Sequence, residues 1–334
     1  MELFDNHKKL FTTAFLFFAV LTILVAILPA LNNQANNAPL PNAIALSEDA
    51  IKGKNIYIAN GCVACHTQQV RNIDMDKVWG ARPGLPADYA ASHRVDFWRN
   101  SATLMGTERT GPDLTNIGIR QPGADWNLVH LYNPRIVVKE SIMPAFPWLF
   151  TIKTQPAKTD VIVTVPAAYL DSKEGKVVAT KDALYLIAYL QSLKQTKLPE
   201  GTAAPEFLYK KEQNKVAGNT ATTELDGKAL YMANCQSCHQ ANGEGLPGAY
   251  PALKGSPIIT GDNLELYVGI IMNGYNARPE YGEMAAVGTN MNFTEYEVAA
   301  IINYEGSNWD NKGKKVTPED IKKLMDFVKL KAPN

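Results

Sequence analysis

Two stretches of sequence decide the fold of this 334-residue chain: CVACH at residues 62–66 and CQSCH at residues 235–239. Together they hold all four cysteines of the protein. Paired cysteines can also form disulfides, zinc sites or redox-active pairs, but a histidine directly after the second cysteine is typical of covalent haem attachment. The two complete motifs therefore predict two covalently bound haems c in one chain.

Length and charge limit the function classes. A chain of this length exceeds one typical domain, so we expect two modules and their connections. Lys and Arg together number 33, as do Asp and Glu, and the net charge is +0. Since there is no basic excess to attract a phosphate backbone, we expect no nucleic-acid partner.

The N-terminal region predicts a membrane anchor. Residues 10–47 carry no charge, and residues 11–28 are almost wholly apolar. About 20 helical residues span roughly 30 Å, the thickness of the hydrocarbon core of a lipid bilayer. A cleaved signal peptide is the alternative, but its apolar region is usually shorter and no clear A-x-A site follows. Lys8 and Lys9 precede the span, so we expect a single pass through the bacterial inner membrane with both haem domains on the periplasmic side.

The rest of the chain repeats one design. Residues 53–62 read GKNIYIANGC and residues 227–235 read GKALYMANC, which is an internal repeat. The predicted boundaries are 1–31 for the cytoplasmic N-terminus and anchor, 32–46 for a polar spacer, 47–194 for the first domain, 195–222 for an exposed linker, and 223–334 for the second domain with its C-terminal helix.

Helices dominate the predicted secondary structure. Ser47 and Thr223 are candidate N-caps of helices that run into the two motifs. Amphipathic stretches at residues 183–194 and 294–304 predict a helix that closes each module. Residues 160–180 alternate as a small β-hairpin does. The chain is therefore predicted to be mainly α, with a hairpin inserted in the first module.

A glycine and a tyrosine four residues apart share one helix face in each module. These pairs are Gly53 with Tyr57 and Gly227 with Tyr231. Glycine allows a crossing helix to approach closely. The candidate crossing partners are Tyr189 and Tyr304.

Methionine in the sixth position of the iron suits electron transfer. In the first module Met143 lies in SIMPAF, where the following proline favours an extended loop ahead of the closing helix. Met75 is too near the motif to reach round easily, and Met105 is interpreted as packing. His130 is the alternative ligand, although a lone histidine in an apolar run is more often structural.

The second module offers three methionines. Met284 precedes the closing helix by the length of a loop, Met291 lies almost on that helix, and Met272 is interpreted as core. Met284 is preferred over Met291, and both remain open. The carbonyls of Pro112 and Pro251, at corresponding places after the motifs, are candidate acceptors for the second ring nitrogen of each histidine. The predicted haem-binding residues are Cys62, Cys65, His66, Cys235, Cys238, His239, Pro112 and Pro251, and the predicted iron ligands are His66, Met143, His239 and Met284.

Three strings in the first module, GCVACHTQQVR, RTGPDLTNIG and VHLYNPRIVVKESIMPAFPWL, behind one N-terminal span, closely resemble the membrane-anchored mono-haem subunit (subunit II) of cbb3-type cytochrome c oxidases. The resemblance covers about residues 1–194. It implies His66 and Met143 as axial ligands and a place on the periplasmic face of a catalytic haem–copper subunit. Residues 79–104 match loosely, and Met105 stands where the family tends to have tryptophan.

The second module is similar to the class I cytochrome c domains attached to oxidase subunits, over about residues 224–328. Its matching strings include GEGLPGAYPALKGSP and FTEYEVAAIINY. The resemblances imply two class I cytochrome c-type helical domains behind a transmembrane helix. A second haem domain behind a usually mono-haem subunit departs from the family.

The leading hypothesis is a di-haem subunit that passes electrons from a periplasmic donor, a small cytochrome c or a copper protein, to the haem–copper subunit of a terminal oxidase in aerobic respiration. No residue of the chain suggests a catalytic centre of its own. Alternatives are the cytochrome subunit of a nitric oxide reductase, a stand-alone anchored electron shuttle, and a di-haem peroxidase, against which the methionines argue. We further hypothesise that the haem at His239 accepts electrons and moves on a flexible linker to the haem at His66.

Overall fold

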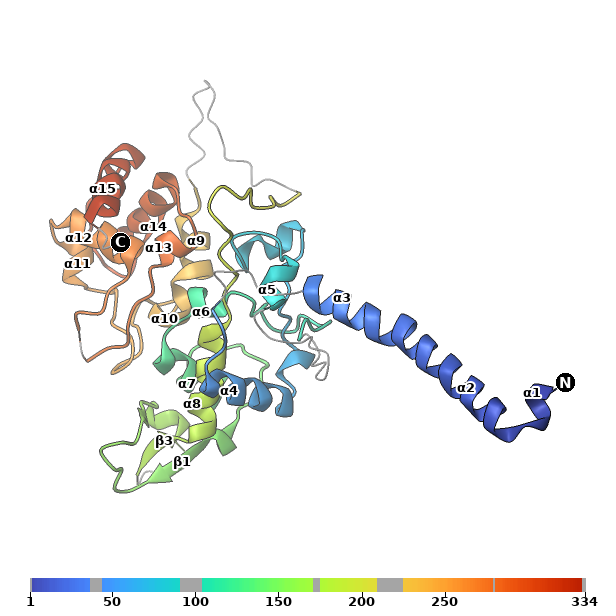
Figure 1. The fold of residues 1–334 in the computed structure, drawn as a ribbon. Helices are drawn as coiled ribbons and strands as arrows, with labels where there is room; N and C mark the ends of the chain where they lie inside the picture. Colours follow the sequence, from blue (N-terminus) through green and yellow to red (C-terminus); the bar gives the residue numbers. More distant parts are fainter. Residues whose placement is uncertain are drawn as a thin grey trace.

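The computed structural model describes six segments of the chain: residues 2–36, 44–90, 104–170, 175–208, 225–278 and 280–331. A long N-terminal helix extends away from a globular body, as Figure 1 shows. In that body the first module comprises the described residues from 44 to 208, and the second module those from 225 to 331.

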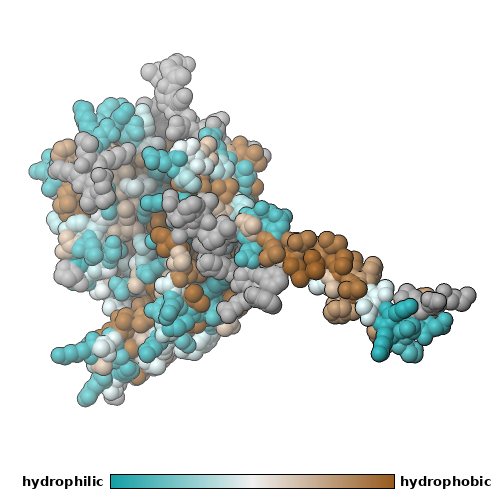
Figure 2. Space-filling view, in the orientation of Figure 1, coloured by the Kyte–Doolittle hydropathy of each residue, from teal (hydrophilic) through white to brown (hydrophobic). Residues whose placement is uncertain are grey.

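The predicted anchor is one helical rod, made of α2 (His7–Leu21), a π-helical stretch η1 (Thr22–Ile27) and α3 (Leu28–Asn36). Its 30 residues are long and apolar enough to cross a membrane, and none of its tested window is buried inside the protein. Figure 2 shows its apolar side chains as a brown rod outside the body, with hydrophilic residues at the N-terminal end. The helix runs five residues beyond the predicted boundary at residue 31, and residues 37–43 of the predicted spacer lie outside the described segments.

Helices are the main regular structure of the first module, as predicted. The helices, in chain order, are α4 (Glu48–Ala59), η2 (Cys62–Ala64), η3 (Asp74–Val78), α5 (Pro86–Ala90), α6 (Ile117–Arg120), α7 (Ala124–Tyr132), η4 (Pro134–Ile136), η5 (Pro147–Leu149), η6 (Ala167–Tyr169) and α8 (Lys181–Ser192). Side-chain caps begin the two long ones: Ser47 accepts from Ala50 N, and Thr180 accepts from Ala183 N. Each cap satisfies a backbone N–H that the helix leaves unpaired.

The second module repeats the design. Its helices are α9 (Gly227–Asn234), α10 (Gln236–His239), α11 (Pro257–Thr260), α12 (Leu264–Asn273), α13 (Val287–Asn290), α14 (Glu295–Ser307) and α15 (Pro318–Lys331). Thr294 and Glu297 form a capping box at the start of α14. The cap at the start of α9 is Asp226, whose side chain accepts from Ala229 N; the predicted cap Thr223 lies outside the described residues.

The glycine–tyrosine pairs mark the helix crossings, and the two predicted partners are confirmed. A Cβ added to Gly53 would collide with Tyr185 O and lie 2.8 Å from Tyr189 Cβ. A Cβ on Gly227 would likewise meet Ala300 O and Tyr304 Cβ. The rings of Tyr57 and Tyr189 then meet edge to face at 5.4 Å, and Tyr231 lies at the same distance from Tyr304.

The predicted hairpin is present, but it belongs to a three-stranded antiparallel sheet in the order β1-β3-β2. The strands are β1 (Phe150–Lys153), β2 (Ile162–Val163) and β3 (Lys176–Ala179). β3 pairs with β2, as the alternation predicted, and also with β1, which the sequence did not predict. The sheet lies at the far end of the first module in Figure 1.

The two modules share a core. Leu246, Ala249 and Tyr250 of the second module are at most 8% exposed and belong to the same apolar cluster as Leu128 and Leu186 of the first. This packing joins the modules far more closely than a linker would.

The first residues of the predicted linker are held by the first module. Gln195 N donates to Asn116 Oδ1 (3.2 Å), and Thr196 N donates to Asp88 Oδ1 (2.9 Å). The predicted linker spans residues 195–222, of which residues 209–222 lie outside the described segments.

The glycine crossing provides a test of the packing. We expect Gly53→Ala to lower the free energy of unfolding by about 2 kcal/mol or more, because the new methyl group meets backbone that cannot move aside. Gly269→Ala in α12 is the control, since the nearest atom to its added Cβ is 4.0 Å away. It should be neutral or stabilising, because alanine is the better helix former. Denaturant unfolding measures both; equal effects would contradict the assignment of the crossing.

Candidate functional site

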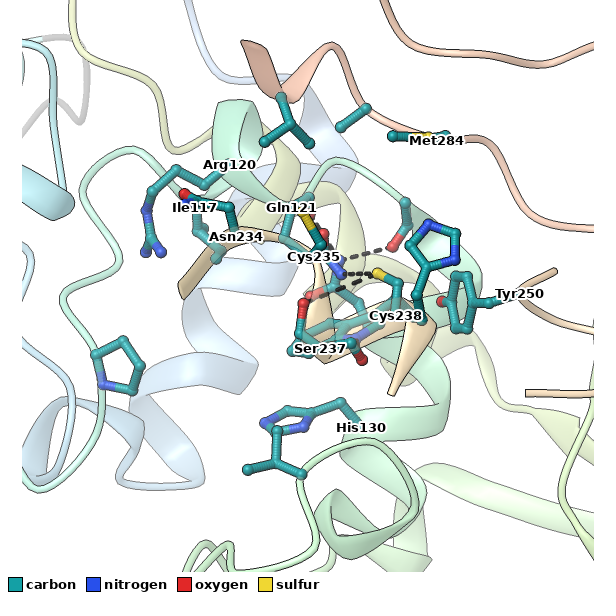
Figure 3. A pocket seen from close by; sticks show the side chains of 18 of the residues that line it. Ile117, Arg120, Gln121, His130, Asn234, Cys235, Ser237, Cys238, Tyr250 and Met284 are labelled. Atoms are coloured by element: carbon teal, nitrogen blue, oxygen red, sulfur yellow. Dashed lines mark hydrogen bonds between the residues drawn. The ribbon is translucent and has the colours of Figure 1, made fainter. Parts of the chain in front are cut away.

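A single continuous cavity of about 1230 Å³ joins both motifs. Pockets for one small ligand usually measure about 300 to 1,000 Å³, so this cavity exceeds the space that one such ligand needs. Cys62, Cys65 and His66 line it from the first module, and Cys235, Cys238 and His239 line it from the second. Figure 3 shows the second motif from within the cavity, with His130 and Met284 on different sides of it.

A proline carbonyl orients each motif histidine. His66 Nδ1 lies 2.8 Å from Pro112 O, and His239 Nδ1 lies 3.0 Å from Pro251 O. Because a carbonyl oxygen can only accept, Nδ1 carries the hydrogen and the lone pair of Nε2 is left for a metal. These are the hydrogen bonds anticipated for Pro112 and Pro251. Burial lowers the pKa of both imidazoles, which keeps them neutral, the form that binds iron.

Gly111 allows the backbone to pass directly beside the His66 ring. A Cβ on this glycine would lie 2.7 Å from His66 Nδ1. A buried carboxylate then fixes the following loop: Asp113 accepts from Thr67 Oγ1, from Gln69 N at 2.8 Å and from Thr115 N at 2.8 Å. The string RTGPDL therefore serves to hold the Pro112 carbonyl against the histidine.

The thiols are not set up for thiolate chemistry. Burial raises the pKa of Cys62 to about 11 and also raises the pKa of Cys235 and Cys238. No disulfide joins the four cysteines. Among the described residues, no three His, Cys, Asp or Glu side chains gather to hold a metal ion by themselves. Neutral thiols beside an apolar cavity fit haem c, where the sulfurs become thioethers.

The structure places the preferred methionines on the cavity. Met143 lines the cavity from a loop that two hydrogen bonds hold. Met143 N donates to Ser141 Oγ (3.3 Å), and Arg135 Nη1 donates to the carbonyl of Met143 (3.3 Å). Met284 lines the cavity from a two-residue antiparallel bridge with Tyr275, with N···O distances of 2.9 and 3.0 Å. In both segments these hydrogen bonds fix the backbone that carries the methionine.

The alternatives fall into two groups. Met291 and His130 also line the cavity, so the choices left open by the sequence stay open. Met272 is 3% exposed in the core of the second module, and Met75 is 67% exposed at the surface. Neither Met272 nor Met75 lies on the cavity, and neither does Met105.

Sequence reasoning missed several cavity residues. Gln121 and Trp126 line it from the first module and touch the second motif, with Gln121 Nε2 3.5 Å from Cys238 Sγ and Trp126 Nε1 3.1 Å from Ser237 O. Trp126 stands four residues before His130, so helical spacing could have placed both on one face. Nothing local in the sequence indicates that this face meets the other module.

Glu305 is a further missed residue. It lies on α14, is 4% exposed, lines the cavity and accepts from Tyr267 OH. Burial raises the pKa of its carboxyl from 4.5 to about 7. A carboxyl with a raised pKa is held mainly neutral below that pH.

Glu305 makes stability depend on pH. Between about pH 4.5 and 7 the folded protein holds a proton that the unfolded chain releases, so the free energy of unfolding falls as pH rises through this window. The loss is on the order of 3 kcal/mol. We expect Glu305→Gln to flatten the dependence, measured by denaturant unfolding at several pH values. Glu319→Gln, which removes an exposed carboxylate of α15, is the control and should keep the slope. An unchanged slope in Glu305→Gln would contradict this role.

The comparisons with known proteins agree with the geometry. Residues 1–180 match the family described as cytochrome c oxidase, mono-heme subunit/FixO. Residues 225–309 match the cytochrome c family. The first match takes in the apolar helix, the first motif and Met143, and the second takes in the second motif and Met284.

Similar individual proteins are also cytochromes or cytochrome subunits by name. The cytochrome c subunit of alcohol dehydrogenase (quinone) from Gluconacetobacter polyoxogenes is 28% identical over 163 residues, 46% of this chain and 34% of that protein. Cytochrome c-552 of Thermus thermophilus is 33% identical over 118 residues, 32% of this chain and 79% of that protein. The fructose dehydrogenase cytochrome subunit of Gluconobacter japonicus is 30% identical over 129 residues, 35% of this chain and 26% of that protein. The chain thus spans only between about a fifth and a third of the length of the dehydrogenase subunits that it matches.

Proposed function

Because the chain belongs to the family of mono-haem cytochrome c oxidase subunits, we propose that it carries electrons from a periplasmic donor to the catalytic haem–copper subunit of a cbb3-type terminal oxidase. The observation that supports this most is the coincidence of three features in one chain: the family match over the anchor and first module, the added cytochrome c module, and one cavity open to both motifs. The chain itself is an electron-transfer subunit of an oxidase-like complex.

We propose that two haems c are bound, one at each motif. When bound, they supply reversible one-electron chemistry at iron. Each histidine would offer Nε2 to an iron while Nδ1–H donates to a proline carbonyl. Met143 and Met284 would supply the sixth ligands. A histidine and a methionine together leave no position for substrate, which suits electron transfer and disfavours a peroxidase.

The proposed orientation has the N-terminus in the cytoplasm and both modules in the periplasm. Lys8 and Lys9 lie in the first turn of the anchor helix, ahead of its apolar stretch, while no positive charge lies between the end of the helix and Lys52. Positive residues are retained on the cytoplasmic side of spans. The modules would then face a donor in the same compartment.

The partner subunit is the point that separates the oxidase from a nitric oxide reductase. Solubilising native membranes in mild detergent, isolating the complex through a tag on this chain and identifying the co-purifying membrane subunit tests the proposal. An oxygen-reducing haem–copper subunit is the expected result. Recovery of a nitric oxide reductase subunit, a dehydrogenase, or the chain alone would overturn it.

Replacing the proposed sulfur ligand of the second iron tests the site. We expect Met284→Ala to abolish the long-wavelength methionine–iron band of one haem and to lower its reduction potential, because the thioether favours the reduced iron. Met291→Ala is the matched control, since it also lines the cavity, and it should keep the band. Loss of the band in Met291→Ala alone would reassign the ligand.

A further inference from the structure

The second haem motif is held against the first module by two side chains of that module. Trp126 Nε1 donates to the carbonyl of Ser237, the second of the two residues between the cysteines, at 3.1 Å. Gln121 Nε2 lies 3.5 Å from Cys238 Sγ, the atom that would carry the thioether bond. Figure 3 shows Gln121 beside Ser237 and Cys238, with the latter contact dashed.

The same tryptophan reaches toward the first motif. Its ring stacks on His130 at a centroid distance of 4.6 Å and an interplanar angle of 13°. His130 Nδ1 is buried and has no hydrogen-bond partner among the described residues, and the ring lines the cavity that also holds His66. Through Trp126 and His130, one face of α7 contacts the second attachment motif and also lines the cavity that the first motif lines.

The contact lies within a buried interface between the two modules. Leu246, Ala249 and Tyr250 pack into the core of the first module. Asn290 Nδ2 also donates to Ile119 O at 2.9 Å, which fastens the end of α13 to α6. Buried apolar contact of this kind resists separation more than the polar rim of a transient contact does.

From this geometry we infer that the contact of Ser237 and Cys238 with Gln121 and Trp126 is the fixed junction through which electrons pass between the two haem sites. Trp126 and Gln121 are positioning residues: they hold the second motif at one separation from the first. This inference rests on the proposed electron-carrying function. The sequence predicts a second module that moves on a flexible linker to deliver electrons, whereas this junction needs no movement of the modules.

The chemistry balances without a proton or a bond change. With haems held at His66 and His239, transfer of one electron would oxidise one iron from Fe(II) to Fe(III) and reduce the other from Fe(III) to Fe(II), and the reductant would be the periplasmic donor of the proposed function. The residues of the junction place packed protein atoms where solvent would otherwise lie. They also hold the second motif in one orientation relative to the first. Tunnelling through packed protein falls steeply with distance, so small displacements of the second motif should slow transfer measurably.

The first test is the viscosity dependence of transfer between the haems. The purified full-length, haem-loaded protein is partly reduced by a light-activated reagent, and the redistribution of electrons is followed by absorbance. A fixed junction gives a rate that does not change when sucrose raises the solvent viscosity. A rate that falls with viscosity would mean that the module must move, and would overturn the inference.

The second test is a matched pair of tryptophan variants. Trp126→Leu should slow the transfer by about tenfold or more, a barrier change of about 1.4 kcal/mol. Trp148→Leu is the control: this tryptophan is 61% exposed, binds Asn60 and does not line the cavity. It should leave the rate unchanged. Trp126→Phe keeps an aromatic ring but removes the N–H donor, so it isolates the bond to Ser237. Equal rates in wild type and Trp126→Leu would overturn the inference.

A readout that does not depend on electron transfer accompanies these rates. Amide hydrogen exchange in residues 124–132 and 236–250 should be faster in Trp126→Leu than in wild type, because the docked interface is loosened. If Trp126→Leu slowed electron transfer but left amide hydrogen exchange unchanged, Trp126 would have only an electronic role, and its role as a positioning residue would be overturned. Since all three measurements use the isolated chain, a failed search for an oxidase partner leaves them interpretable, and failure of the junction leaves the partner assignment standing.

Discussion

Tyr250, with Leu246 and Ala249 beside it, packs into the apolar core of the first module, and the arrangement of both candidate haem sites depends on this burial. Without it the two motifs would stand on separate domains joined by a chain segment. With it, the carbonyl of Ser237 comes within reach of Trp126 on α7, and the sulfur of Cys238 comes within reach of Gln121, the residue after α6. A sequence repeat that duplicates one domain has thus become a single body with one internal cavity.

Within each module, the same few contacts shape the site. A glycine brings the closing helix against the first helix, a tyrosine pair fills the crossing, and a proline carbonyl turns the histidine ring. The glycine permits close backbone approach, and the carbonyl selects the tautomer that leaves Nε2 for iron. The repetition of this set in α9 and α14 explains why so little sequence identity outside the motifs is needed to build a second site.

Local sequence rules predicted the parts that have local causes. Spacing and residue type predicted the cap Ser47, the crossing of Gly53 with Tyr189, and the division of the fold into an anchor helix and two modules. Strand β1 was missed because it has only four residues, and so short a strand shows too little alternation of side chains to be recognised. The contacts of Gln121 and Trp126 were missed for a different reason: they arise from docking between distant segments, which no periodicity encodes. The roles of Met143 and Met284 remain proposals.

The distance between the two irons tests the central claim, a shared cavity across a fixed junction, most directly. Pulsed electron paramagnetic resonance on the fully oxidised, haem-loaded, full-length protein measures the distribution of that distance in frozen solution. The packing of the second motif on α7 predicts one narrow distribution, which Trp126→Leu broadens. A broad distribution in the wild type, as a module moving freely on its linker would give, would contradict the account.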